Sequence, residues 1–236
     1  MLRIRNIRRL LFVIYGALTA LILVFTVLYG IGAPAQYLKF GVRLSMLLTL
    51  ILLKKKYLAQ RLLVPAFVCT VISDYFFVLL RVLNPDFANR NIYGMLGFIL
   101  AYLFLIAAFQ KNVRFGKMEL LTLVPFVLIF SLVLWALARY AEGLMFWAAI
   151  FLGIVLSYAG MTMVATVYRG YFRKEAAWRI ALSGCILFAS DMVVAFSIFH
   201  PEFQGYILWK ENLIWTTYMA GWLLLLTVAP DEQLLA

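Results

Sequence analysis

Long apolar stretches alternate with short polar segments along the whole chain. Each stretch holds about 20 residues, the length of a helix that crosses a bilayer, so the pattern predicts transmembrane helices. We expect eight spans, at about residues 10–32, 36–53, 62–83, 91–110, 118–138, 144–168, 177–199 and 208–229, with a turn at 33–36. The predicted fold is all-α: a polytopic membrane helix bundle in which residues 1–236 form one eight-span domain.

The basic residues predict how this bundle is oriented. Lys and Arg gather on the side of the N-terminus, in segments 3–9, 54–61, 111–117 and 169–179. Because positively charged residues favour the cytoplasmic side, we expect both termini in the cytoplasm. An even number of spans agrees with that arrangement. We expect an integral, multi-pass protein of a bacterial cell (inner) membrane.

Composition excludes several classes of protein. The chain is 66% hydrophobic and 13% charged, whereas soluble domains are about 45–50% apolar and about 25% charged. The net charge of +11 does not indicate a nucleic-acid partner, because the cations flank apolar stretches and form no separate basic domain. One histidine and two cysteines within predicted spans predict no metal site. We expect no cofactor.

Two Ser-Asp dipeptides lie inside predicted spans, at Ser73-Asp74 and Ser190-Asp191. An ionisable group at the bilayer centre costs roughly 2.5–3.5 kcal/mol on insertion scales and is therefore a functional hypothesis. Both dipeptides lie slightly outward of the midpoint, on spans of the same direction, four helices apart. This similarity is compatible with a four-plus-four repeat, in which two halves of four helices each are related by an axis along the membrane normal.

Other polar residues lie at a similar depth and have simpler explanations. Arg43 can extend toward the membrane surface, Tyr102 and Tyr218 can pack with a bonded hydroxyl, and the serines can bond to their own helix. If these groups meet, two close carboxyls can divide acid and base roles between them. An arginine beside them would keep one carboxylate charged or hold a phosphate.

At these residues the chain resembles the YhhN family of lysoplasmalogenase-like membrane proteins. The resemblance rests on a Gly/Phe pattern leading into Ser-Asp in the seventh span, a Gly/Phe/Ala pattern in the fourth, a cation in the second, and matches in the sixth and eighth. The residues are Gly184, Phe188, Ser190, Asp191, Gly94, Phe98, Ala101, Phe109, Arg43, Tyr158, Met163, Tyr218 and Ala220.

The chain also departs from the family pattern. One residue, Ala189, stands between Phe188 and Ser-Asp where two are usual. Tyr102 stands in place of a histidine, and Ser73 in place of a glycine before the first aspartate. Leu44 replaces a proline and Gly221 a glutamine. These departures leave open which substrate is used and whether activity is kept.

The resemblance implies hydrolysis of the vinyl ether bond of lysoplasmalogen, a lysophospholipid, to a fatty aldehyde and a glycerophospho-ethanolamine or -choline. Asp74 and Asp191 would be the catalytic acid and base, with the order left open. The expected substrate-binding residues are those that share the site with them: Arg43, to help bind phosphate, Tyr102, to orient water or substrate, and Ser73, Ser190, Tyr158 and Tyr218.

Other functions stay open on the sequence. The same cavity would serve a non-catalytic lipid-binding or transport protein, although broken helices at matching points would then be expected. An intramembrane aspartyl protease also needs two aspartates, but it carries Gly-x-Gly-Asp where this chain has Ser-Asp. A metal-dependent ceramidase-like hydrolase is disfavoured by the lone His200. The sequence leaves the oligomeric state, the head group and the chain length of a substrate undetermined.

Overall fold

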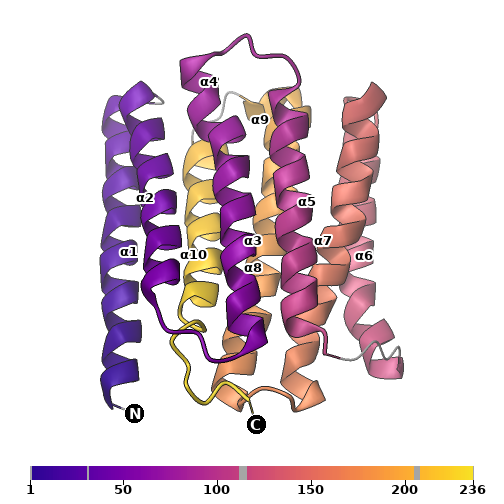
Figure 1. Ribbon diagram of the computed structural model, residues 1–236. Coiled ribbons are helices and arrows are strands. Elements are labelled where there is room, and N and C mark those ends of the chain that lie inside the picture. The colour runs from indigo at the N-terminus through magenta and orange to yellow at the C-terminus, as the bar shows by residue number, and fades with distance from the viewer. Residues whose placement is uncertain (1, 31, 112–115, 205–207, 236) are drawn as a thin grey trace.

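A bundle of long helices forms the whole of the described structure (Figure 1). The computed structural model describes residues 2–30, 32–111, 116–204 and 208–235. Arg114, one of the basic residues used to predict orientation, lies outside them. The helices are α1 (Leu2–Tyr29), α2 (Ala33–Leu52), α3 (Leu58–Asp74), α4 (Leu80–Leu83), α5 (Arg90–Phe109), α6 (Lys117–Leu137), α7 (Gly143–Arg169), α8 (Lys174–Phe199), α9 (Pro201–Gln204) and α10 (Ile214–Leu226).

The all-α bundle agrees with the prediction, and seven helices are long and apolar enough to cross a membrane. These are α1, α2, the continuous helix 58–83, and α5 to α8. The eighth predicted span corresponds to α10, which has 13 residues and is shorter than the others. Residues 33–36 were expected to form a turn, but they are the first turn of α2, because Pro34 suits the start of a helix.

Two short π-helices interrupt the α-helical pattern. Segment η1 (Tyr75–Leu79) follows Asp74 directly and joins α3 to α4, and η2 (Leu208–Leu213) leads into α10. A π turn holds more residues than an α turn and is often found at functional sites. It changes which residues share a helix face, so the face that α4 presents differs from that of a regular helix continued from α3.

Helices α3, α5, α8 and α10 form the middle of the bundle (Figure 1). Glycines let some of the neighbouring helices pack closely. A Cβ atom on Gly97 in α5 would lie 2.5 Å from the Ser73 hydroxyl of α3. A Cβ atom on Gly184 in α8 would lie 2.8 Å from the Met163 Cβ of α7. Small residues let membrane helices approach this closely.

The outer helices present large apolar side chains to their surroundings. Along α6 the exposed residues include Leu120, Leu121, Leu128, Leu132 and Trp135. A soluble protein rarely exposes so continuous an apolar surface, which suits contact with lipid.

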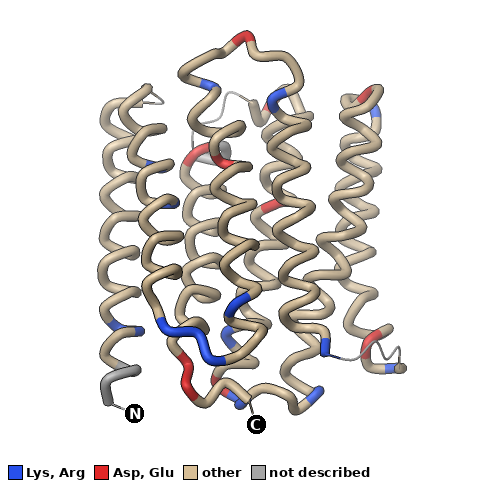
Figure 2. The backbone as a smooth tube through the Cα atoms, viewed as in Figure 1, with Lys and Arg blue, Asp and Glu red and all other residues tan. Residues whose placement is uncertain are grey.

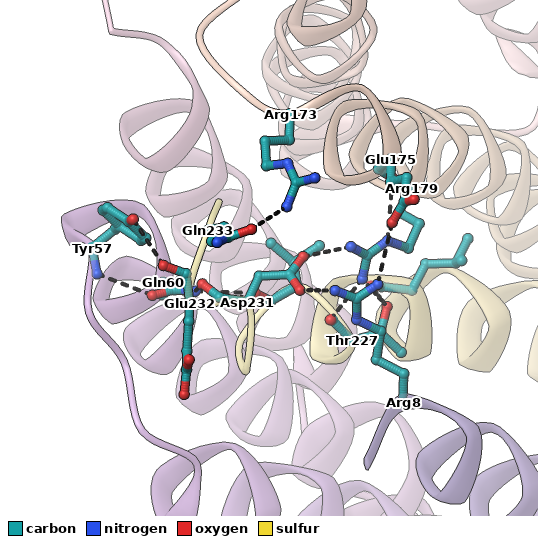
Figure 3. A network of polar contacts seen from close by, with 12 residues as sticks. Arg8, Tyr57, Gln60, Arg173, Glu175, Arg179, Thr227, Asp231, Glu232 and Gln233 are labelled. Carbon is teal, nitrogen blue, oxygen red and sulfur yellow. Dashed lines mark hydrogen bonds and ion pairs between the residues drawn. The ribbon is translucent and has the colours of Figure 1, made fainter. Parts of the chain in front are cut away.

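Both termini lie at the same end of the bundle, and basic residues gather at that end (Figures 1 and 2). There the C-terminal tail is fixed by Asp231, which is buried and paired with Arg8 of α1 and with Arg179 of α8 at 2.5 Å (Figure 3). The backbone oxygen of Asp231 accepts a hydrogen bond from Gln60 of α3 at 2.7 Å. One tail residue therefore links three helices.

Candidate functional site

Asp74 forms an ion pair with Arg43 inside the bundle. Oδ2 of Asp74 accepts hydrogen bonds from Arg43 Nε at 2.9 Å and from the Tyr218 hydroxyl at 2.8 Å. The two charged side chains are almost fully buried. Among the described residues nothing bonds to the other oxygen, Oδ1, so it can accept a hydrogen bond from water or a ligand.

The guanidinium of Arg43 is held on every side by protein groups. Its Nη2 donates to the Thr70 hydroxyl at 2.7 Å and Nη1 contacts the Met46 sulfur at 3.6 Å. The rings of Tyr218 and Trp222 lie 4.6 and 5.3 Å from its central carbon, close enough for cation–π attraction. Of the two roles expected for Arg43, charge compensation is the one that these contacts favour.

Asp191 has a different environment. Its Oδ2 accepts a hydrogen bond from the Tyr102 hydroxyl at 2.6 Å, and both side chains are buried. No Lys or Arg of the described residues forms an ion pair with it. Tyr102, which stands where the family pattern has a histidine, therefore fixes the position of this carboxyl through a neutral hydrogen bond.

Both aspartates line one cavity of about 140 Å³. The wall includes Asp74, Tyr218 and Asp191, together with the rings of Phe77 and Phe98. A water molecule occupies about 30 Å³ in the liquid, and the lining carries several polar groups that can bind it. The two carboxyls that sequence reasoning singled out are thus brought to one space.

Three charged residues other than the aspartates, Lys39, Arg81 and Glu211, also line this cavity. Glu211 of η2 accepts hydrogen bonds from Lys39 of α2 at 2.5 Å and from Arg81 of α4 at 3.1 Å. Gln36 contacts the same carboxylate at 3.4 Å. Lys39 and Glu211 are buried, and the Arg81 side chain is 32% exposed. Arg81 is therefore the most exposed of these three charged residues.

Asp191 also borders a second cavity, which is apolar and lies between α5, α6, α7 and α8. Its volume is about 60 Å³, and its wall includes Phe130, Leu134, Leu152 and Phe199. Asp191 is the only acidic or basic residue in that wall, within the described residues. This carboxyl thus stands between a polar space and an apolar one.

The remaining predicted residues have structural contacts. The Ser73 hydroxyl donates to the Gly94 carbonyl of α5 at 2.5 Å. The Ser190 hydroxyl approaches the Ile214 carbonyl of α10 at 3.5 Å, a long contact. Tyr158 is half-buried in α7, packs against the apolar core and lines neither cavity. These residues hold helices in place around the aspartates.

Sequence reasoning missed the charged end of the cavity. Lys39, Arg81 and Glu211 were assigned no role in the site from the sequence. One signal was available: Lys39 lies four residues before Arg43, so both share one face of α2. Arg81 follows the π-helix η1 and Glu211 lies within the π-helix η2, and both π-helices change the helix register in a way that hydropathy does not reveal.

The described residues hold no group of three or more His, Cys, Asp or Glu side chains placed to bind a metal ion. A model of the YhhN family matches residues 35–229 of the chain. That range contains both aspartates and every residue that lines the two cavities. No curated protein matches the chain. No solved structure matches it either.

Proposed function

The chain belongs to the YhhN family, which includes lysoplasmalogenases, and we propose that it hydrolyses the vinyl ether bond of lysoplasmalogens. The products are a fatty aldehyde and a glycerophospho-ethanolamine or -choline. One observation carries the proposal: two buried carboxyls with unlike partners line a single cavity. That is the arrangement which acid–base hydrolysis of an acid-labile ether needs.

The partners of each carboxyl support a division of roles. Arg43 compensates the charge of an ionised Asp74, and Oδ1 of Asp74 is left to accept a proton from water. Asp191 has the Tyr102 hydroxyl as its partner and borders the apolar cavity. An unpaired charge beside apolar groups is costly, so we assign Asp191 as the neutral acid and Asp74 as the base.

The reaction then follows in three steps that balance. Asp191 gives its proton to the vinyl carbon that is not bonded to oxygen, and an oxocarbenium ion forms at the other. Water adds to that ion while Asp74 takes one of its protons. When the bond between the hemiacetal carbon and the glycerol oxygen breaks, Asp74 returns its proton to that oxygen, which leaves as a hydroxyl. Asp191 takes the proton of the hemiacetal hydroxyl, the chain leaves as an aldehyde, and both aspartates regain their starting states.

Single variants in detergent test the two roles. We expect Asp191→Asn and Asp74→Asn each to lower kcat for aldehyde release about 10²- to 10⁴-fold, the usual contribution of a general acid or base. Asp86→Asn is the matched control, because Asp86 lies exposed in the loop between α4 and α5. Rates are compared on monodisperse protein, so that a folding defect is not counted as a catalytic one.

The same assay separates hydrolysis from the alternative of lipid binding or transport. A wild-type protein that binds lysoplasmalogen and releases no aldehyde would favour the alternative. Near-normal rates in both aspartate variants would contradict the acid–base assignment while leaving hydrolysis itself in place.

We also propose that residues 208–226 form the eighth span. The six residues of η2 and the thirteen of α10 follow one another without a break, and together they approach the about 20 residues that cross a bilayer. Termini at one end of the bundle support an even number of spans (Figure 1). Both termini in the cytoplasm, the four-plus-four repeat and a bacterial inner membrane stay predictions.

A further inference from the structure

A cluster of charged side chains forms the outer part of the cavity that the aspartates share. It consists of Lys39, Arg81 and Glu211, which come from α2, α4 and η2. Lys39 and Arg81 bind different oxygens of the Glu211 carboxylate, at 2.5 and 3.1 Å. All three residues line the cavity.

The charges in this cluster do not cancel. Two cations face one carboxylate, whereas Asp74, which lines the same cavity, is compensated one to one by the fully buried Arg43. One positive charge is therefore in excess among the described residues at the outer end. In a membrane protein a cation that is not compensated is costly, and a ligand with one negative charge would balance it.

Two residues that line the cavity, Arg81 and Trp215, have hydrogen-bond donors without an acceptor in the described part of the chain. Among the described residues, the Arg81 guanidinium makes one polar contact, through Nη1 to Glu211. The Trp215 side chain is buried and lines the cavity, and its indole Nε1 has no hydrogen-bond partner. A buried donor without an acceptor is costly, so an oxygen-rich group that reaches Trp215 would relieve that cost, and Arg81 has donors left to bind such a group.

The position of the cluster also fits a lipid. Arg81 is partly exposed, Asp191 in the wall of the same cavity is buried, and Asp191 also borders the apolar cavity. A lysophospholipid has the same order of parts: a phosphate, a glycerol with the bond to be cleaved, and an apolar chain.

We propose that Lys39, Arg81 and Trp215 form the binding site for the phosphate of a lysophospholipid head group, with Glu211 holding both cations in place. The inference rests on the proposed function for the identity of the lipid, but its recognition element is the phosphate. Arg81 is the residue to test, because it is partly exposed and a substitution there disturbs the interior least.

The test is equilibrium binding of two lipids that contain no vinyl ether bond. One is a 1-O-alkyl-lysophosphoethanolamine and the other is the 1-O-alkylglycerol of the same chain length, which lacks the phosphate. We expect the full-length wild type to bind the phospholipid about ten- to a hundredfold more tightly, as a charge-assisted hydrogen bond contributes. In Arg81→Gln that preference should fall to near one.

Two further variants serve as controls for this binding experiment. Arg139→Gln is the matched control, since Arg139 is an exposed arginine in the loop between α6 and α7 and lines neither of the two cavities beside Asp191; it should keep the full preference. Arg81→Lys keeps the positive charge and should keep part of the preference for the phospholipid. Equal weakening of both lipids in Arg81→Gln would mean that the arginine only supports the fold, and this overturns the inference.

Competition with inorganic phosphate distinguishes a head group from a free anion. We expect glycerophosphoethanolamine to displace the phospholipid, and inorganic phosphate to do so more weakly. Displacement by inorganic phosphate alone, with no preference between the two lipids, would overturn the assignment to a lipid.

The outcome is separable from that of the proposed function, because neither lipid can be hydrolysed by vinyl ether chemistry. A phosphate preference that depends on Arg81, in a protein that releases no aldehyde, would contradict the proposed hydrolysis and leave the binding site standing. Aldehyde release with an unchanged KM in Arg81→Gln would contradict the binding site and leave hydrolysis standing.

Discussion

Replacing Arg43 with methionine tests the ion pair on which the site is built. The pair is buried, with the Arg43 side chain fully inaccessible and that of Asp74 5% exposed. Arg43→Met keeps apolar contact with the surrounding rings but leaves the Asp74 charge without compensation. Breaking a buried pair in this way costs about 3–5 kcal/mol.

The size of the effect makes it measurable in detergent. For a chain of this size, 1 kcal/mol corresponds to about 2–4 °C in Tm, so we expect Arg43→Met to lower the apparent Tm by roughly 6–20 °C. Asp74→Asn should also be destabilising, because it leaves the charge of Arg43 buried without a counter-charge.

The double variant supplies the control. Arg43→Met with Asp74→Asn contains no uncompensated charge, and the asparagine oxygen can still accept the hydrogen bond of Tyr218. We expect the double variant to be more stable than the sum of the two single changes predicts, by several kcal/mol. It should release no more aldehyde than Asp74→Asn alone, since the base is missing.

The measurement is a thermal scan by loss of the monodisperse fraction, at one fixed scan rate because membrane proteins often unfold irreversibly. Additive single effects would show that Arg43 and Asp74 do not interact. The cation–π contacts of Arg43 are lost in the double variant as well, so recovery of stability should be partial. Full activity in Arg43→Met would also refute the reasoning.

Three further changes test the surroundings of the site. Tyr102→Phe removes the neutral partner of the acid and should lower kcat about fivefold with little change in KM, as measured by aldehyde release, since one hydrogen bond is worth about 1 kcal/mol. Gly97→Ala should destabilise by about 1–3 kcal/mol through overpacking, whereas Gly41→Ala, which has open space around its Cβ position, should not lower the Tm. Asp231→Asn should lower the Tm and loosen the C-terminal tail, with limited proteolysis as the readout, because it weakens two ion pairs (Figure 3).

The two aspartates of the site could be predicted from the sequence, because the reason for singling them out does not depend on how the helices pack. A carboxyl in an apolar stretch is costly in any fold, so Asp74 and Asp191 could be identified before their neighbours were known. Their depth along each helix follows from the rise per residue alone. The family resemblance drew on the same residues, and the family match agrees with it.

The partners of these residues could not be predicted in the same way. Whether Arg43 faces Asp74 or Asp191 depends on how α2 is rotated about its axis and on which helix packs beside it. Those are three-dimensional quantities, and no periodicity in a single chain fixes them. The role of Arg43 was therefore left between charge compensation and phosphate binding, and its contacts with Asp74 and Thr70 favour the first.

The charged cluster was missed for a different reason. Hydropathy averages over a window, so a cation near a helix end is counted as a loop residue even when it points inward. Lys39 is 3% exposed and is such a case. Arg81 follows η1, whose π turn rotates the rest of the helix relative to Asp74. A sequence that looks like a regular helix conceals this rotation.

One aromatic ring connects the two halves of the site. Phe98 lies in the walls of both cavities. Its ring packs 5.8 Å from the ring of Tyr218, which binds Asp74, and 6.5 Å from that of Tyr102, which binds Asp191. Because packed interiors are not continuously deformable, a displacement of this ring would move both tyrosines together. Helix α5 carries neither carboxyl, but it supplies Tyr102 to Asp191 and packs Phe98 against Tyr218, the tyrosine that binds Asp74.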